Sequence, residues 1–161
     1  MYIYLIRHGI AGDRAKYSND ADRPLTDIGR NKTKKVAKRL FDLDLRFDII
    51  LTSPLVRAME TAKILQEVQL CKKIETFEPL SPNGDINIWI NWYALHKSCN
   101  SIALVGHQPD LGNWAEILTW GKTQEKLIVK KAGVIGVRIS ENGTPIGNSE
   151  IFLLSSPKWL V

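Results

Sequence analysis

The sequence has 161 residues, of which 44% are hydrophobic, and this suits a single domain over residues 1–161 with a substantial core. No apolar run approaches the ~20 residues of a membrane-spanning helix, so we expect no membrane partner. The chain begins with strand-like residues and lacks the basic segment of a secretory signal, which favours a cytoplasmic location. The formal net charge of +5 favours anionic partners such as phosphates, acidic proteins or nucleic acids.

The cysteines and the basic residues exclude several classes of function. Cys71 and Cys99 are the only cysteines, too few for a disulfide framework, and they form no closely spaced ligand pair with the histidines. We therefore expect free thiols, no metal site and no cofactor. Six basic residues lie between positions 30 and 39 without interleaved aromatic residues, which favours a solvated helix face over a nucleic-acid surface.

Strands and helices are predicted to alternate through the first 120 residues. Apolar runs predict strands at 2–6, 47–52, 74–77 and 101–105. Apolar residues at helical spacing predict helices at about 26–43, 53–69, 86–96 and 109–118. Thr26, Ser53 and Asp85 are residue types that cap helix N-termini, and each stands at the start of one of these helices.

The last 40 residues follow a different pattern. Short apolar runs predict strands at 127–129, 133–139 and 150–154, with a turn signal at 141–144. Alternating strands and helices followed by a hairpin predict an α/β fold. We expect a three-layer α/β/α sandwich whose central sheet is mostly parallel, with antiparallel strands at an edge.

Charged and polar residues stand where three of the predicted parallel strands end. Arg7 and His8 follow the first strand, Arg57 follows the second and His107 follows the fourth. Because ligands in open α/β sheets bind beyond the carboxyl ends of the strands, we expect these residues to share one rim. A single Arg-His-Gly tripeptide is more often structural than catalytic. Arginine or histidine after each of three separate strands, however, favours a functional site. Gly9 would let the backbone approach a ligand closely.

The residue types at this rim suit phosphoryl transfer. Guanidinium groups present planar forks that match phosphate oxygens. A neutral histidine can attack phosphorus and carry the phosphoryl group covalently, and a second histidine can donate a hydrogen bond to it. The sequence has no acidic cluster typical of magnesium sites, so we expect a metal-independent reaction.

Four blocks of the sequence resemble the histidine phosphatase superfamily, also called phosphoglycerate mutase-like. The blocks are Leu5-Ile6-Arg7-His8-Gly9, residues 25–29 (Leu-Thr-Asp-Ile-Gly), residues 53–61 and Val105-Gly106-His107. Residues 23–26, 80–85 and 107–109 more narrowly resemble the SixA-type phosphohistidine phosphatases. The resemblance covers nearly the whole chain and implies the phosphoglycerate mutase-like fold.

The resemblance also implies roles for individual residues. His8 would be the nucleophile that becomes phosphohistidine. Arg7, Arg57 and His107 would bind the phosphoryl oxygens, with Gly9 giving the backbone access to them. Water would then hydrolyse the intermediate.

The general acid is the role that the sequence leaves open. Glu78 directly follows the third predicted strand and is our first candidate. A loop carboxylate without a catalytic part is an equal interpretation of this residue. Asp85 is a second candidate, and Asp13, Asp20 and Asp22 in the first loop are further alternatives.

The predicted function is hydrolysis of phosphohistidine on a protein, such as a phosphotransfer domain in a signalling relay. The chain has no room for a large helical lid, and an open site suits a protein substrate better than an enclosed small molecule. One alternative is a phosphomonoesterase of the same superfamily that acts on small phosphate esters. Another is a non-catalytic phosphate-binding interaction module; a nucleic-acid partner is not expected.

Overall fold

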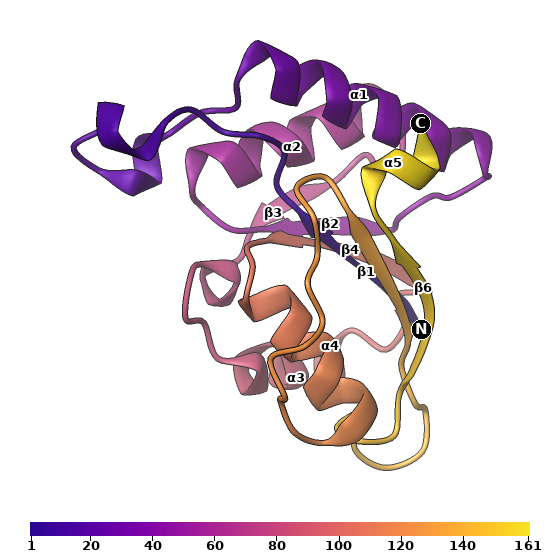
Figure 1. Cartoon of the computed structure of the whole chain (residues 1–161). Coiled ribbons are helices and arrows are strands. Elements are labelled where there is room, and N and C mark those ends of the chain that lie inside the picture. Colours follow the sequence, from indigo (N-terminus) through magenta and orange to yellow (C-terminus); the bar gives the residue numbers. More distant parts are fainter.

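One six-stranded sheet forms the middle layer of the computed structural model, which describes residues 1–161 (Figure 1). The strands are β1 (Tyr2–Arg7), β2 (Ile49–Thr52), β3 (Ile74–Thr76), β4 (Ser101–Gly106), β5 (Val134–Arg138) and β6 (Glu150–Ser155). Their spatial order is β3-β2-β4-β1-β5-β6. The first four strands pair in parallel, whereas β5 is antiparallel to both β1 and β6. The predicted fold is confirmed; the antiparallel strand lies one position inside the edge.

Helices cover both faces of this sheet. On one face lie α1 (Asp27–Asp42), α2 (Val56–Glu67) and α5 (Pro157–Leu160), and on the other lie α3 (Ile86–Leu95) and α4 (Asp110–Trp120) (Figure 1). Three short 3-10 turns complete the fold: η1 (Arg14–Lys16), η2 (Asp20–Asp22) and η3 (Glu78–Leu80). Each face has its own core of 18 buried residues, so the central strands are buried on both sides. This explains their almost wholly apolar sequences.

The predicted caps of α1 and α3 are confirmed. Thr26 Oγ1 accepts a hydrogen bond from the Gly29 N–H at 3.0 Å, and the Asp85 carboxylate accepts one from the Asn87 N–H at 2.8 Å. Gly29 also permits close packing, because a Cβ atom there would lie 2.0 Å from the carbonyl oxygen of Ile10. The first loop and the start of α1 are thereby held together.

The predicted start of α2 is wrong. The helix begins at Val56 rather than at Ser53-Pro54, and it has no side-chain cap. The Ser53 hydroxyl accepts a hydrogen bond from the Leu55 N–H at 3.3 Å and lies 2.8 Å from Nε2 of His107. Because its hydroxyl forms a hydrogen bond with His107, Ser53 belongs to the rim of the sheet rather than to the helix.

The predicted strand at 127–129 is also wrong. This segment is held by a side-chain amide instead of a neighbouring strand: Gln108 donates to the Leu127 carbonyl at 2.9 Å and accepts from the Val129 N–H at 3.2 Å. Farther back, the Glu116 carboxylate, which is 0% exposed, accepts hydrogen bonds from the backbone N–H groups of residues 124–127. Burial alone would raise the pKa of Glu116, but these donors lower it to about 2.

Neither cysteine is paired, as predicted. Cys71 is buried and Cys99 is partly buried, and both are free thiols. None of the five helices combines the length and the apolar character that crossing a membrane requires.

Candidate active site

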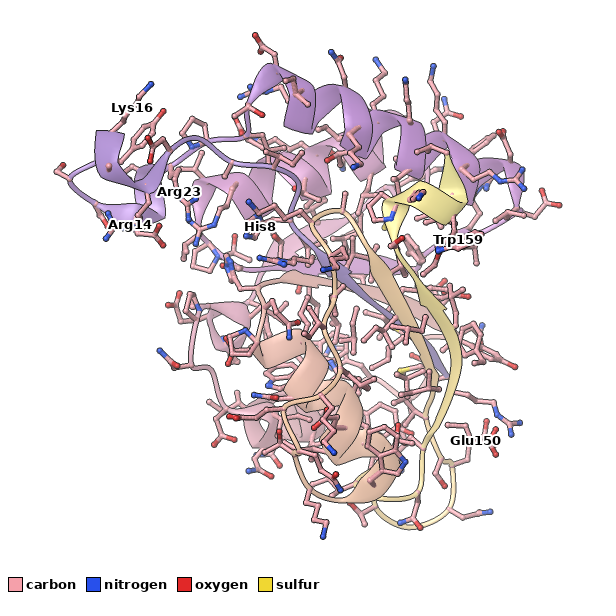
Figure 2. All side chains as sticks on the ribbon, in the orientation of Figure 1. His8, Arg14, Lys16, Arg23, Glu150 and Trp159 are labelled. Atoms are coloured by element: carbon pink, nitrogen blue, oxygen red, sulfur yellow. The ribbon has the colours of Figure 1, made fainter.

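The carboxyl ends of neighbouring parallel strands bring the four predicted rim residues together. Arg7 ends β1 and His8 follows it, Arg57 lies in the first turn of α2 after β2, and His107 follows β4. The His8 and His107 rings have their centroids 5.1 Å apart, and Nε of Arg57 donates to Nε2 of His8 at 3.2 Å. The two histidines and Arg57 are each at most 5% exposed. Figure 2 shows His8 between the first loop and the helix that carries Trp159.

The surroundings of His8 keep its imidazole neutral. Nδ1 lies 2.7 Å from the carbonyl oxygen of Gly9, so Nδ1 carries the ring proton and donates a hydrogen bond to this oxygen. Nε2 is then unprotonated, and its lone pair accepts the hydrogen bond from Nε of Arg57. Burial, followed by the nearby His107 and the two arginines, lowers the pKa of His8 to about 3. The ring therefore has the protonation state and the orientation of a nucleophile.

Gly9 connects the end of β1 to α2. Its N–H donates to Oγ1 of Thr61 at 3.1 Å, and the Thr61 hydroxyl donates to the Arg57 carbonyl at 2.8 Å. A Cβ atom at Gly9 would lie 2.3 Å from Oγ1 of Thr33, so no larger residue fits without a shift. Because its N–H is already paired, Gly9 serves close packing in this structure rather than direct hydrogen bonding to a ligand.

Three arginines surround the carboxylate of Asp20, which lies in η2. Arg57 donates to the Asp20 carbonyl at 2.8 Å and to Oδ2 at 2.9 Å. Arg23 donates to Oδ1 at 2.9 Å, and Nε of Arg14 lies 3.3 Å from the same oxygen. Burial would raise the pKa of Asp20, but Arg57 and Arg23 lower it below its usual value. Asp20 is therefore an ionised carboxylate, and it holds the Arg57 guanidinium beside His8.

Arg7 and His107 each present a buried polar atom without a partner in the protein. Arg7 donates from Nη1 to the Val129 carbonyl at 2.9 Å, but its Nε makes no hydrogen bond. His107 has Nε2 beside the Ser53 hydroxyl, while its Nδ1 is unpaired. Burial and the charge of Arg57 lower the pKa of His107 to about 4. Oxygens of an anionic ligand bound at this rim would be suitable partners for both unpaired atoms.

The other carboxylates considered for the general acid form no hydrogen bond or ion pair with Arg7, His8, Arg57 or His107. Glu78 is exposed at the start of η3 and accepts a hydrogen bond from the Ser81 hydroxyl at 3.1 Å. Asp85 caps α3 and Asp13 caps η1 through backbone N–H groups. Asp20 alone among the candidates contacts Arg57.

Four contributors to the rim do not figure among the residues predicted from the sequence: Arg23, Ser53, Thr61 and the Val129 carbonyl. Arg23 had a signal, because it opens the Arg-Pro-Leu-Thr block that resembles the SixA type. Ser53 and Thr61 had a signal too, because they stand at the two ends of the 53–61 block. The Val129 carbonyl acts through a contact between segments that are distant in sequence, and no local pattern marks it.

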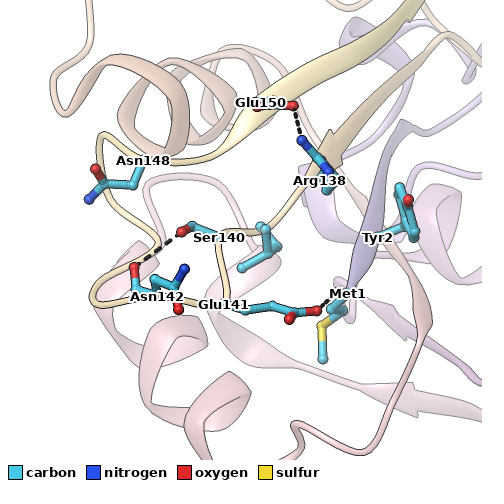
Figure 3. Close-up of a pocket in the computed structure, with 9 residues that line it drawn as sticks. Met1, Tyr2, Arg138, Ser140, Glu141, Asn142, Asn148 and Glu150 are labelled. Atoms are coloured by element: carbon cyan, nitrogen blue, oxygen red, sulfur yellow. Dashed lines mark hydrogen bonds and ion pairs between the residues drawn. The ribbon is translucent and has the colours of Figure 1, made fainter.

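A separate pocket of about 350 Å³ lies at the opposite end of β1 (Figure 3). Its charges pair with one another: Arg138 lies 2.5 Å from Glu150, and the amino group of Met1 lies 3.9 Å from Glu141. No group of three or more His, Cys, Asp or Glu side chains is placed to hold a metal ion. At the carboxyl end of the sheet, by contrast, Arg7 and His107 have buried polar atoms without partners, so we place the candidate site there.

Comparison with known proteins defines the class to which this fold and site belong. The model of the histidine phosphatase superfamily (branch 1) matches residues 3–81, which include Arg7, His8 and Arg57. The chain belongs to this superfamily.

Among individual proteins, the chain is similar to SixA. The structure of the protein histidine phosphatase SixA complexed with tungstate matches with a TM-score of 0.88 and 25% identity over the full length of both chains. Phosphohistidine phosphatase SixA of Escherichia coli is 27% identical over 151 residues, which cover 89% of this chain and 90% of SixA. An uncharacterised protein of Picosynechococcus is 46% identical over 100% of this chain and 99% of its own. Superfamily membership and the SixA-like structure support phosphatase activity.

The two neutral histidines should make the stability of the protein depend on pH. Their pKa values in the folded protein, about 3 and 4, lie below the ordinary value of 6.5, so the unfolded chain binds protons first as the pH falls. We expect the free energy of unfolding to decrease by about 4 kcal/mol between pH 7 and pH 5, measured by urea denaturation. In a His107→Gln variant about half of this decrease should disappear. An unchanged pH dependence in the variant would contradict a buried neutral His107.

Proposed function

We propose that this protein hydrolyses phosphohistidine on a protein substrate through a covalent phosphohistidine formed on His8. The observation that carries the proposal is the neutral His8 ring, whose unprotonated Nε2 faces Arg57 beside two unpaired buried donor groups. The similarity to SixA supports the substrate class. The matching SixA structure is a complex with tungstate, which is an oxyanion like phosphate, and this supports oxyanion binding by the present chain.

In the first step, the Nε2 lone pair of His8 attacks phosphorus and forms a P–N bond. The P–N bond to the substrate imidazole breaks, and the leaving nitrogen takes a proton from water or from Glu78, the proposed general acid. Arg7 and Arg57 neutralise the phosphoryl oxygens with charge-assisted hydrogen bonds. With the Ser53 hydroxyl donating to Nε2 of His107, the neutral ring carries its proton on Nδ1 and donates it to a third oxygen.

In the second step, water attacks the phosphorus and the P–N bond to His8 breaks. The products are inorganic phosphate and the neutral imidazole with its lone pair restored on Nε2. The Gly9 carbonyl accepts a hydrogen bond from the Nδ1–H group throughout, so it stabilises the positive ring of the intermediate and fixes its orientation. Two guanidinium groups and His107 supply the charge stabilisation, and the proposed reaction is therefore metal-independent.

Glu78 remains our proposed general acid, because Asp20 is ionised and paired with arginines. A Glu78→Gln variant should lose about 10- to 100-fold in kcat on a phosphomonoester, whose alkoxide leaving group needs a proton. On phosphoramidate the loss should be smaller than threefold, because a P–N nitrogen is protonated more easily. Steady-state phosphate release measures both. Equal losses on the two substrates would contradict an acid role for Glu78.

The test of the function is a phosphate-release assay in the presence of EDTA. A histidine-phosphorylated phosphotransfer protein is compared with a panel of small phosphomonoesters. We expect the protein substrate to have the higher kcat/KM and EDTA to have no effect. Release from the small esters alone would favour a small-molecule phosphomonoesterase, and release from no substrate would favour a phosphate-binding module.

A further inference from the structure

A second pocket, of about 360 Å³, shares Arg7 with the candidate active site. Besides Arg7, its lining contains four lysines and only one hydrophobic residue. The lysines are Lys32, Lys130, Lys131 and Lys158. We call this the basic pocket.

The charges of the basic pocket are of one sign. No carboxylate lines it, and none of its four lysines forms an ion pair within the protein. A different pocket, between α1 and α2, contains Glu60 and Glu67 beside three basic residues, and Arg30 there pairs with Glu60 at 2.6 Å. Unpaired cations that converge on one hollow attract anionic groups.

Three separate segments supply these lysines. Lys32 lies on α1, Lys158 on α5 and the adjacent pair Lys130 and Lys131 directly before β5. The helices α1 and α5 pack on the same face of the sheet (Figure 1). The backbone segment that carries the lysine pair also includes Val129, whose carbonyl accepts a hydrogen bond from the Arg7 guanidinium. The basic pocket is therefore fixed beside the site rather than remote from it.

We infer that the basic pocket binds acidic side chains of the protein substrate, next to its phosphohistidine. This inference rests on the proposed function and deepens it. All four lysines are exposed. Their ammonium groups act as separate point charges on flexible stems, unlike the planar forks that fix one phosphate. Four such charges on three segments match several carboxylates spread over a protein surface. They would concentrate the substrate at Arg7 and increase its association rate.

The test is a charge reversal at three lysines, Lys130→Glu, Lys131→Glu and Lys158→Glu, combined in one variant. A matched control reverses three exposed lysines of α1 and α2 that do not line the pocket: Lys34, Lys38 and Lys63. The net charge changes equally in both variants. We expect the pocket variant to lose about 10- to 100-fold in kcat/KM on a histidine-phosphorylated phosphotransfer protein, through KM and with a weaker salt dependence. Its kinetics on phosphoramidate should stay within about twofold of the wild type.

Other outcomes would overturn the inference. Equal losses in the pocket variant and the control would mean that overall charge is sufficient. An equal loss on phosphoramidate would mean that the lysines act on Arg7 and not on the substrate protein. A larger increase in KM for a small bisphosphate than for the phosphoprotein would assign the pocket to a second phosphate.

A binding measurement separates this inference from the proposed function. If the wild type hydrolyses small esters but not the phosphoprotein, the proposed function fails. Binding of hexaglutamate is then compared between the wild type and the pocket variant by calorimetry at low salt. Loss of binding in the pocket variant alone would support a carboxylate site, and equal binding would overturn it.

Discussion

Replacing His8 by alanine should lower kcat by about 10⁴-fold or more on every substrate that the protein hydrolyses, because the covalent route disappears with the nucleophile. Arg57 and His107 would still bind the phosphoryl group, so substrate affinity should fall much less. The measurement is phosphate release from the phosphoprotein and from a small ester. The His96→Ala variant is the matched control, since His96 packs on Trp92 at the end of α3, and its activity should be unchanged.

A second measurement identifies the atom that carries the phosphoryl group. Wild-type protein quenched during turnover with labelled substrate should hold label that is stable to alkali and lost in acid, as a P–N bond requires. The His8→Ala variant should hold none. Substantial turnover by this variant would contradict covalent catalysis at His8. If the protein were a binding module, there would be no turnover to lose and phosphate affinity would survive the substitution.

The sequence predicted the rim because its cause is local. An apolar strand that stops at a polar residue places that residue at the carboxyl edge of a parallel sheet, as at Arg7 and His107. Arg57 reaches the same edge because it lies in the first turn of the helix that follows β2. The contacts that orient these residues are not local. Asp20 holds Arg57 across 37 residues of sequence, and Ser53 meets His107 across 54. Such pairs depend on how loops fold over the sheet, which the periodicity of one segment does not encode.

The errors in the predicted elements have the same physical origin. Residues 127–129 are apolar enough for a strand, but Gln108 takes the hydrogen bonds that a strand partner would have made. Ser53-Pro54 is a strong helix start by composition, but the Ser53 hydroxyl forms a hydrogen bond with His107 instead of capping the helix. In both places a side chain that follows β4 forms the hydrogen bond that a neighbouring strand or a helix cap would otherwise have formed. Departures from local rules thus concentrate around the candidate site, as expected where function competes with regular structure.

The Arg57→Lys variant should lose about 10²- to 10³-fold in kcat although the positive charge is kept. Nε of Arg57 donates to His8, and its two terminal nitrogens bind Asp20, so one planar group orients both the nucleophile and the loop. A lysine ammonium is a single point charge and cannot make this set of hydrogen bonds. Stopped-flow or steady-state phosphate release measures the loss, and thermal unfolding checks that the variant is folded.

The Arg23→Lys variant is the matched control for this prediction. Arg23 binds the opposite oxygen of the Asp20 carboxylate and makes no hydrogen bond to His8. It should therefore lose less than about tenfold in kcat, since it acts on the nucleophile only through Asp20 and Arg57. A loss of less than tenfold in Arg57→Lys itself would mean that positive charge is sufficient beside His8. The fork geometry of the guanidinium would then have no catalytic part, and the phosphoryl oxygens would depend on Arg7 and His107 for directed hydrogen bonds.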